Sequence, residues 1–200
     1  MMTHRNGTTD RKRKVDLKRN LVAWSLPLFA LQFVGMALLA CDKDATAAAK
    51  EPSATAKVKG FTDPALTGTV TFTATAGGAL HVRGTIAGLK FGSMYAIHVH
   101  EKGNCSTPDS AGGHFHTGLE THGNPYGSEG THHDGDLPNL QVDSLGTGHF
   151  DLVTTSLQVT AGPLNAVGRS VIVHAGPDDY STPPSGNSGA RIGCGVIVAD

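Results

Sequence analysis

Charged side chains are scarce in this chain of 200 residues. Asp, Glu, Lys and Arg together make up 16%, well below the roughly 25% of an average domain, and no stretch shows the repeat of an amphipathic helix. This scarcity argues against coiled coils, long helices and charged tails. The formal net charge is only −1, which excludes the broad basic surface of a nucleic-acid-binding protein. We therefore expect no nucleic-acid partner.

Glycine is abundant by contrast, and the remaining sequence favours short strands. Glycine supplies 26 residues, about twice the usual share. Apolar and polar residues alternate, as in half-buried strands, over 68–75, 80–89, 95–100, 148–155, 170–174 and 191–198. Many short strands separated by glycine-rich turns predict an all-β sandwich or barrel. Two stretches, 101–140 and 175–190, fit neither strand nor helix, and loops of such length are usually functional or held in place by other groups.

The N-terminal segment is typical of an exported protein. Residues 1–40 carry seven basic and two acidic side chains, which leaves 9 basic and 15 acidic residues, a net charge of −6, in the remainder. An apolar run over 21–40 follows the basic block and ends directly before Cys41, as in a secretory signal. The ending Leu-Leu-Ala-Cys resembles a bacterial lipobox, whose cysteine is lipidated and becomes the new N-terminus. An uncleaved membrane anchor is the alternative, since about 20 residues can span a bilayer.

This pattern predicts three regions. Residues 1–41 form an export signal with a lipobox ending at Cys41, residues 42–59 a flexible linker without large apolar side chains, and residues 60–200 the folded domain. Both interpretations of the signal place the domain outside the cytoplasm, in the periplasm or cell envelope. A multiply acylated Cys41 would hold it firmly at a membrane.

Histidine is the most unusual component, and its distribution indicates a metal site. Seven of the 11 histidines fall between positions 98 and 133. His98 and His100 are two residues apart on a predicted strand, so both rings face the same side. A bound metal ion is a physically sufficient way to order the long loop that holds most of the others. Four imidazoles suit Cu(II), whereas three imidazoles with one carboxylate suit a closed zinc site.

The cysteines allow one disulfide. Of the three cysteines, Cys41 is assigned to the lipid, which leaves Cys105 and Cys194 as an even pair in an oxidising compartment. A bridge between them would close a loop of about 90 residues and attach the long loop to the last predicted strand. Two free buried thiols, or two metal thiolates, are the alternatives.

Several short motifs together resemble one family, the copper,zinc superoxide dismutases, and most closely the bacterial secreted branch. The resemblance covers about residues 68–198 and rests on HVHEKGNC from His98, GGHF around His114, HG at His122, HDGDLP from His133, VH ending at His174, DD at Asp178 and GNSGARIGCGVI from Gly186. It implies a Greek-key β-barrel of about eight antiparallel strands with two long functional loops.

The resemblance also implies ligands and roles for individual residues. Copper would be held by His98, His100, His114 and His174, and zinc by His114, His122, His133 and Asp136. Asp178 would accept hydrogen bonds from His98 and His122, which fixes the orientation of the rings. Arg191 would attract the anionic substrate beside the copper, and Cys105 and Cys194 would form the disulfide.

The implied activity is the dismutation of superoxide to dioxygen and hydrogen peroxide, which would protect the cell envelope from superoxide arising outside the cytoplasm. His114 would carry a proton in this reaction, because an imidazole binds two metals only after losing its N–H proton. Zinc would hold the ring and take no part in redox chemistry, because it is d¹⁰.

Some features depart from the family pattern or leave alternatives open. His116 stands where family members usually carry Asn or Asp, and His132 directly precedes the assigned ligand His133. A copper-binding domain without turnover would be expected to lack a ligand or Arg191, and a zinc hydrolase would need an open zinc position and a nearby base. The sequence does not decide between a monomer and a homodimer.

Overall fold

The computed structural model describes residues 50–118, 121–128 and 130–200. The predicted export signal, with Cys41, lies outside these described residues. Within them, no helix is both long and apolar enough to cross a membrane.

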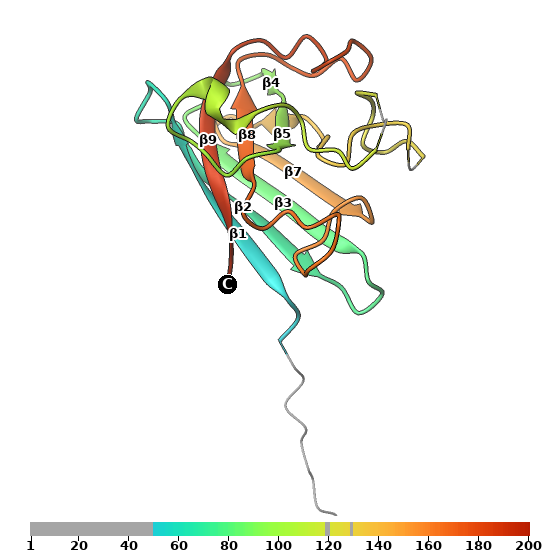
Figure 1. The fold of residues 1–200 in the computed structure, drawn as a ribbon. Helices are drawn as coiled ribbons and strands as arrows, with labels where there is room; N and C mark the ends of the chain where they lie inside the picture. The colour runs from blue at the N-terminus through green and yellow to red at the C-terminus, as the bar shows by residue number, and fades with distance from the viewer. Residues whose placement is uncertain (1–49, 119–120, 129) are drawn as a thin grey trace, which may run out of the picture. The chain divides into compact units, whose positions relative to one another are not determined.

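The regular secondary structure of the described chain is almost entirely β-strand (Figure 1). Its strands are β1 Ser53–Gly60, β2 Thr67–Ala74, β3 Leu80–Ala87, β4 Met94–Tyr95, β5 Ile97–His100, β6 Leu140–Val142, β7 Gly148–Thr154, β8 Ser170–His174 and β9 Arg191–Ala199. A single 3₁₀ turn, η1 Pro108–Ala111, lies in the loop after β5. The strands form one antiparallel sheet in the order β4-β6-β7-β3-β2-β1-β9-β8-β5.

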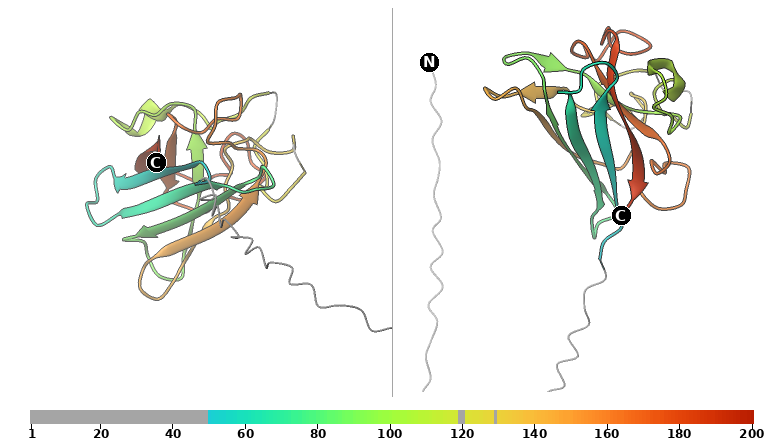
Figure 2. Two further views of the ribbon diagram at one scale, coloured as in Figure 1. Left: turned by 90° about the horizontal axis from the view of Figure 1, so that it is seen from below. Right: turned by 90° about the vertical axis from the view of Figure 1, so that its left-hand side faces the viewer.

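The sheet curls into a nearly closed barrel. Strands β4 and β5 lie at opposite ends of the sheet order, yet only Ala96 separates them in the chain. Ala96 also pairs with the segment around β8, since its carbonyl accepts a hydrogen bond from the His174 N–H at 2.9 Å. The curled sheet is visible in Figures 1 and 2. The predicted all-β barrel of about eight strands is therefore confirmed, because β4 and β5 are one strand interrupted at Ala96.

Alternation along the strands builds the core. In β2 and β3 every second side chain points inward, so that Val70, Phe72, Val82 and Ile86 are fully buried while the residues between them face outward. Burying apolar area in this way is the main favourable term in folding. Strands β5 and β8 differ, because every residue in each of them is buried, and these two strands carry histidines of the site.

The sequence-based prediction was wrong about two strands. Strand β1 occupies the C-terminal part of the predicted linker, 42–59, and pairs with both β2 and β9. Its inward residues are Ala54, Ala56 and Val58, and two of these are too small to produce a clear hydrophobic alternation. Strand β6 lies at the end of the stretch 101–140 and has only three residues, which is too short to show a period.

Candidate metal centre

Strands β5 and β8 and the loop after β5 bring the predicted ligands together. His98 and His100 lie on β5, and His174 is the last residue of β8, the antiparallel neighbour of β5. The loop after β5 returns His114 to the same place, where it forms an isolated bridge with His100. The ring centres of His98 and His114 are 4.0 Å apart, and those of His98 and His174 are 4.9 Å apart. Antiparallel pairing thus places ligands from distant parts of the sequence side by side.

The first group consists of four buried histidines, whose ligand atoms all lie within 4.8 Å of one another: His98, His100, His114 and His174. In each ring one nitrogen is buried without a hydrogen-bond partner, namely His98 Nδ1, His100 Nε2, His114 Nε2 and His174 Nε2. A buried polar atom without a partner is costly. Four such lone pairs converging on one point fit a metal ion that prefers imidazole ligands.

The other nitrogen of each ring in this group has a polar partner, which orients the ring. His98 Nε2 lies 2.8 Å from Asp178 Oδ2, and His100 Nδ1 donates to the Gly112 carbonyl at 3.0 Å. His174 Nδ1 lies 3.0 Å from the hydroxyl of Ser188. Partners of this kind hold the free nitrogen of a ligand ring toward the metal.

The second group consists of His114, His122, His133 and Asp136, and it shares His114 with the first. Asp136 Oδ1 lies 2.8 Å from His114 Nδ1, 3.2 Å from His122 Nδ1 and 3.4 Å from His133 Nδ1. The second carboxylate oxygen, Oδ2, accepts backbone hydrogen bonds from Gly123 and His133, both at 3.0 Å. Three imidazoles and one carboxylate around a point are the donor set of a closed tetrahedral zinc site.

Asp178 belongs to neither group but contacts one histidine of each. Its Oδ2 lies 2.8 Å from His98 Nε2, and its Oδ1 lies 2.8 Å from His122 Nε2. Gly186, with φ +62°, passes so close that a Cβ there would overlap the Asp178 carboxylate. Only a glycine fits at this approach, so the carboxylate is held between the two rings and the backbone of the loop.

Burial keeps three histidines of the first group, His100, His114 and His174, neutral. Loss of solvation lowers the pKa of His100 to about 2 and that of His174 to about 3. It also lowers the pKa of His114 to about 4, against the opposing effect of the Asp136 carboxylate. Neutral imidazole is the form that binds a metal, so these rings are in the ligand state at neutral pH.

The two carboxylates favour positive charge in the second group. Burial disfavours the charged form of His122, but hydrogen bonds to Asp136 and Asp178 outweigh it and raise the pKa of His122 to about 9. Burial likewise opposes ionisation of Asp136, yet its hydrogen bonds with His114 and His122 hold its pKa far below the usual range. A site built to stabilise a proton between two carboxylates also favours a divalent cation in its place.

Arg191 is anchored beside the first group. Its guanidinium donates to the Pro108 carbonyl at 2.9 Å and to the Gly112 carbonyl at 2.8 Å. The Gly112 carbonyl also accepts the hydrogen bond from His100, so the cation and a ring of the first group share one acceptor. The positive charge of Arg191 further lowers the pKa of His100 and His174, because the guanidinium lies close enough to repel a proton on either ring.

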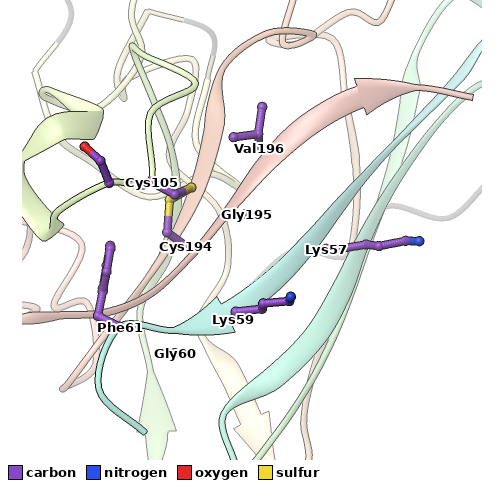
Figure 3. A pocket seen from close by; sticks show the side chains of 9 residues that line it. Lys57, Lys59, Gly60, Phe61, Cys105, Cys194, Gly195 and Val196 are labelled. Atoms are coloured by element: carbon purple, nitrogen blue, oxygen red, sulfur yellow. A yellow bond between two sulfur atoms is a disulfide. The ribbon is translucent and has the colours of Figure 1, made fainter. Parts of the chain in front are cut away.

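The predicted disulfide is confirmed. Cys105 and Cys194 are bonded, with their Cα atoms 5.6 Å apart and a sequence separation of 89. The bridge attaches the loop that carries Pro108 and Gly112 to β9, which carries Arg191. A pocket of about 420 Å³ lies beside this bridge and is bordered by Lys57, Lys59 and Phe61. Figure 3 shows the side chains that line it.

Two histidines that the sequence left open lie outside both groups. The ring centre of His116 is 5.4 Å from that of His133, and its side chain is exposed. His132 is buried, and its Nδ1 donates to the backbone carbonyl of His133 at 2.7 Å. The Glu101 carboxylate, in the loop after β5, accepts a backbone hydrogen bond from Gly113 at 3.2 Å. Sequence reasoning missed Asn139, because nothing in the motif around it shows that its side chain contacts Asp178.

A β-barrel that carries two adjoining imidazole-rich sites with one shared histidine defines a class of metalloprotein with paired metal ions. The family model described as copper/zinc superoxide dismutase matches residues 66–197. The chain therefore belongs to the copper/zinc superoxide dismutase family, which uses copper and zinc as cofactors.

Relatives agree with this assignment over most of their length. The chain is 38% identical over 185 residues to a superoxide dismutase [Cu-Zn] of Deinococcus radiodurans, covering 87% of this chain and 95% of the relative. It is 43% identical over 155 residues to a superoxide dismutase [Cu-Zn] of Caulobacter vibrioides, covering 72% of this chain and 85% of the relative. Among solved structures, the clock protein EA4 is similar, with a TM-score of 0.66 and 36% identity over 74% of this chain and 95% of the other.

Proposed function

We propose that this chain dismutates superoxide to dioxygen and hydrogen peroxide at a site formed by the two ligand groups. The observation that carries the proposal is the convergence of four orphaned ring nitrogens, one of them on a histidine whose other nitrogen faces Asp136. The first group, His98, His100, His114 and His174, would hold copper. The second group, His114, His122, His133 and Asp136, would hold zinc.

The bound metals supply one-electron redox chemistry from copper and fixed positive charge from zinc. Two superoxide anions and two protons give one dioxygen and one hydrogen peroxide. Arg191 binds and orients each anion through a charge-assisted hydrogen bond. The two carbonyls that hold its guanidinium keep that charge next to the rings of the first group.

His114 moves one of the two protons. With both ring nitrogens used as ligands, His114 would have no N–H proton. Its Nε2 would take up a proton in one half of the cycle and deliver it to the reduced substrate in the other. The second proton comes from solvent. Asp178 holds His98 and His122 in place and thereby keeps the ligands on both sides of His114 fixed.

A superoxide-consumption assay on protein of known metal content tests this function. We expect dismutation by protein that holds copper and zinc, and a loss of that activity in proportion to the copper removed by a chelator. Restoring copper should restore the rate. Full activity in copper-free protein would contradict the proposed reaction.

We propose further that the enzyme works outside the cytoplasm, attached to a membrane through lipid on Cys41, where it protects the cell envelope. The basic block, the apolar run and the lipobox-like ending support this location. The Cys105–Cys194 bond agrees with it, because disulfides persist in oxidising compartments.

Cys41→Ser tests the lipid anchor. The full-length variant is expected to lose the lipid-dependent mass increase and the N-terminus that begins at residue 41, both measured by mass spectrometry of the membrane fraction. Ser25→Ala, in the same apolar run, should keep both. A wild-type chain that is found uncleaved in the membrane would instead support the alternative of a membrane-spanning anchor.

A further inference from the structure

The buried amide side chain of Asn139 forms two hydrogen bonds with the backbone of Asp178. Asn139 follows the second ligand group in the chain, directly before β6, and is 6% exposed. Its Nδ2 donates to the Asp178 carbonyl at 2.9 Å, and its Oδ1 accepts from the Asp178 N–H at 2.8 Å. Both polar atoms of the side chain therefore bind the two backbone groups of one residue, 39 positions away.

Two further hydrogen bonds, both involving Tyr180, connect Asn139 with Asp178. The backbone N–H of Asn139 donates to the hydroxyl of Tyr180 at 2.8 Å, and the backbone N–H of Tyr180 donates to Asp178 Oδ1 at 2.6 Å. The segment around Asp178 belongs to the long connection between β8 and β9, which has no strand of its own. Asn139, directly before β6, thus anchors this connection to a strand of the barrel.

The position of the Asp178 carboxylate depends on these hydrogen bonds with Asn139. Its two oxygens contact His98 Nε2 and His122 Nε2, one ring from each ligand group, both at 2.8 Å. A shift of the Asp178 backbone would move the carboxylate away from at least one of these rings. The ring would then lose the partner that keeps its other nitrogen directed toward the metal.

We propose that Asn139 is a positioning residue for the metal centre: by holding the backbone of Asp178, it keeps His122 and His98 in the orientation that binds zinc and copper. This inference rests on the metal sites given under Proposed function. An amide suits the task because it offers one donor and one acceptor together, as a peptide group does. Alanine offers neither, and would leave the buried N–H and carbonyl of Asp178 without these partners.

Zinc affinity of the full domain, measured by competition with a chromogenic chelator, tests the proposal. Loss of a group that orients a metal ligand typically lowers metal affinity about 10- to 100-fold, and we expect a loss in this range for Asn139→Ala. In an Asp178→Asn background the same substitution should change zinc affinity less than about threefold, because residues that act through one another are not additive.

The control is Asn165→Ala, which removes an amide that accepts a hydrogen bond from Val167 N–H at 3.0 Å and does not contact Asp178. It should bind zinc as the wild type does. An Asn139→Ala affinity within threefold of wild type would overturn the proposal. So would an equally large loss in the Asp178→Asn background, since Asn139 would then act by another route.

A measurement on the unmodified chain covers the case in which Asn139→Ala does not fold. In the metal-free wild type, the amide hydrogen of Asp178 should be protected from exchange with solvent, because Asn139 accepts it. Exchange at the rate of an unprotected amide would overturn the proposal. A wild-type chain that binds no zinc would contradict the metal sites themselves, which distinguishes the two failures.

Discussion

Replacing His114 by alanine should reduce superoxide dismutation to the rate of the metal-free chain. His114 is the residue common to both groups, with Nε2 among the first group's orphaned nitrogens and Nδ1 2.8 Å from Asp136. Its removal takes one ligand from each site and the proton carrier from between them. Superoxide consumption per mole of bound copper, together with the zinc content, measures the effect.

His116→Ala is the matched control for this substitution. It removes an imidazole from the same loop, two residues further on, and His116 belongs to neither ligand group. We expect it to keep activity within about twofold of wild type, since the substitution of an exposed side chain that supplies no ligand has little effect. A His114→Ala protein that holds both metals and dismutates superoxide at the wild-type rate would refute the shared role.

Removing the disulfide should give the largest loss of stability. With a sequence separation of 89 between Cys105 and Cys194, the loop-entropy relation gives a loss of about 4–5 kcal/mol in the free energy of unfolding. Urea unfolding of the metal-free Cys105→Ser/Cys194→Ser variant, compared with the oxidised wild type, measures this loss. The usual total stability of a domain is about 5–15 kcal/mol, so the variant would be close to unfolding.

Reduced wild-type protein and Ser106→Ala serve as controls for the disulfide. The reduced protein should match the double serine variant, whereas Ser106→Ala, next to Cys105, should unfold like the wild type. An unfolding free energy within 1 kcal/mol of wild type, for a double variant that still shows native circular dichroism, would show that the bridge contributes little.

Much of the barrel was predictable because its strands follow a two-residue alternation with large inward side chains, such as Val70 and Phe72 in β2. Strand β1 was not predictable in this way, since Ala54 and Ala56 pack inside while resembling the alanines of a linker. Their burial is decided by the pairing of β1 with β9, which joins opposite ends of the domain.

The sequence alone indicated that some ligands lie together, but not how all of them are grouped. The spacing of His98 and His100 on one strand indicates a shared face, but the grouping with His174 depends on the antiparallel pairing of β5 with β8. Only the family resemblance supplied that partner in advance. The role of Asn139 could not be predicted, because its side chain forms hydrogen bonds with the backbone of a residue 39 positions away.

The pairing of β1 with β9 has a consequence for when this molecule can form. The first strand of the barrel lies between β2 and the last strand, β9, which also supplies Arg191 and Cys194. A nascent polypeptide that still lacks β9 cannot complete the β1–β9 pairing or supply Arg191. We therefore expect the barrel to be completed only after β9 has been synthesised.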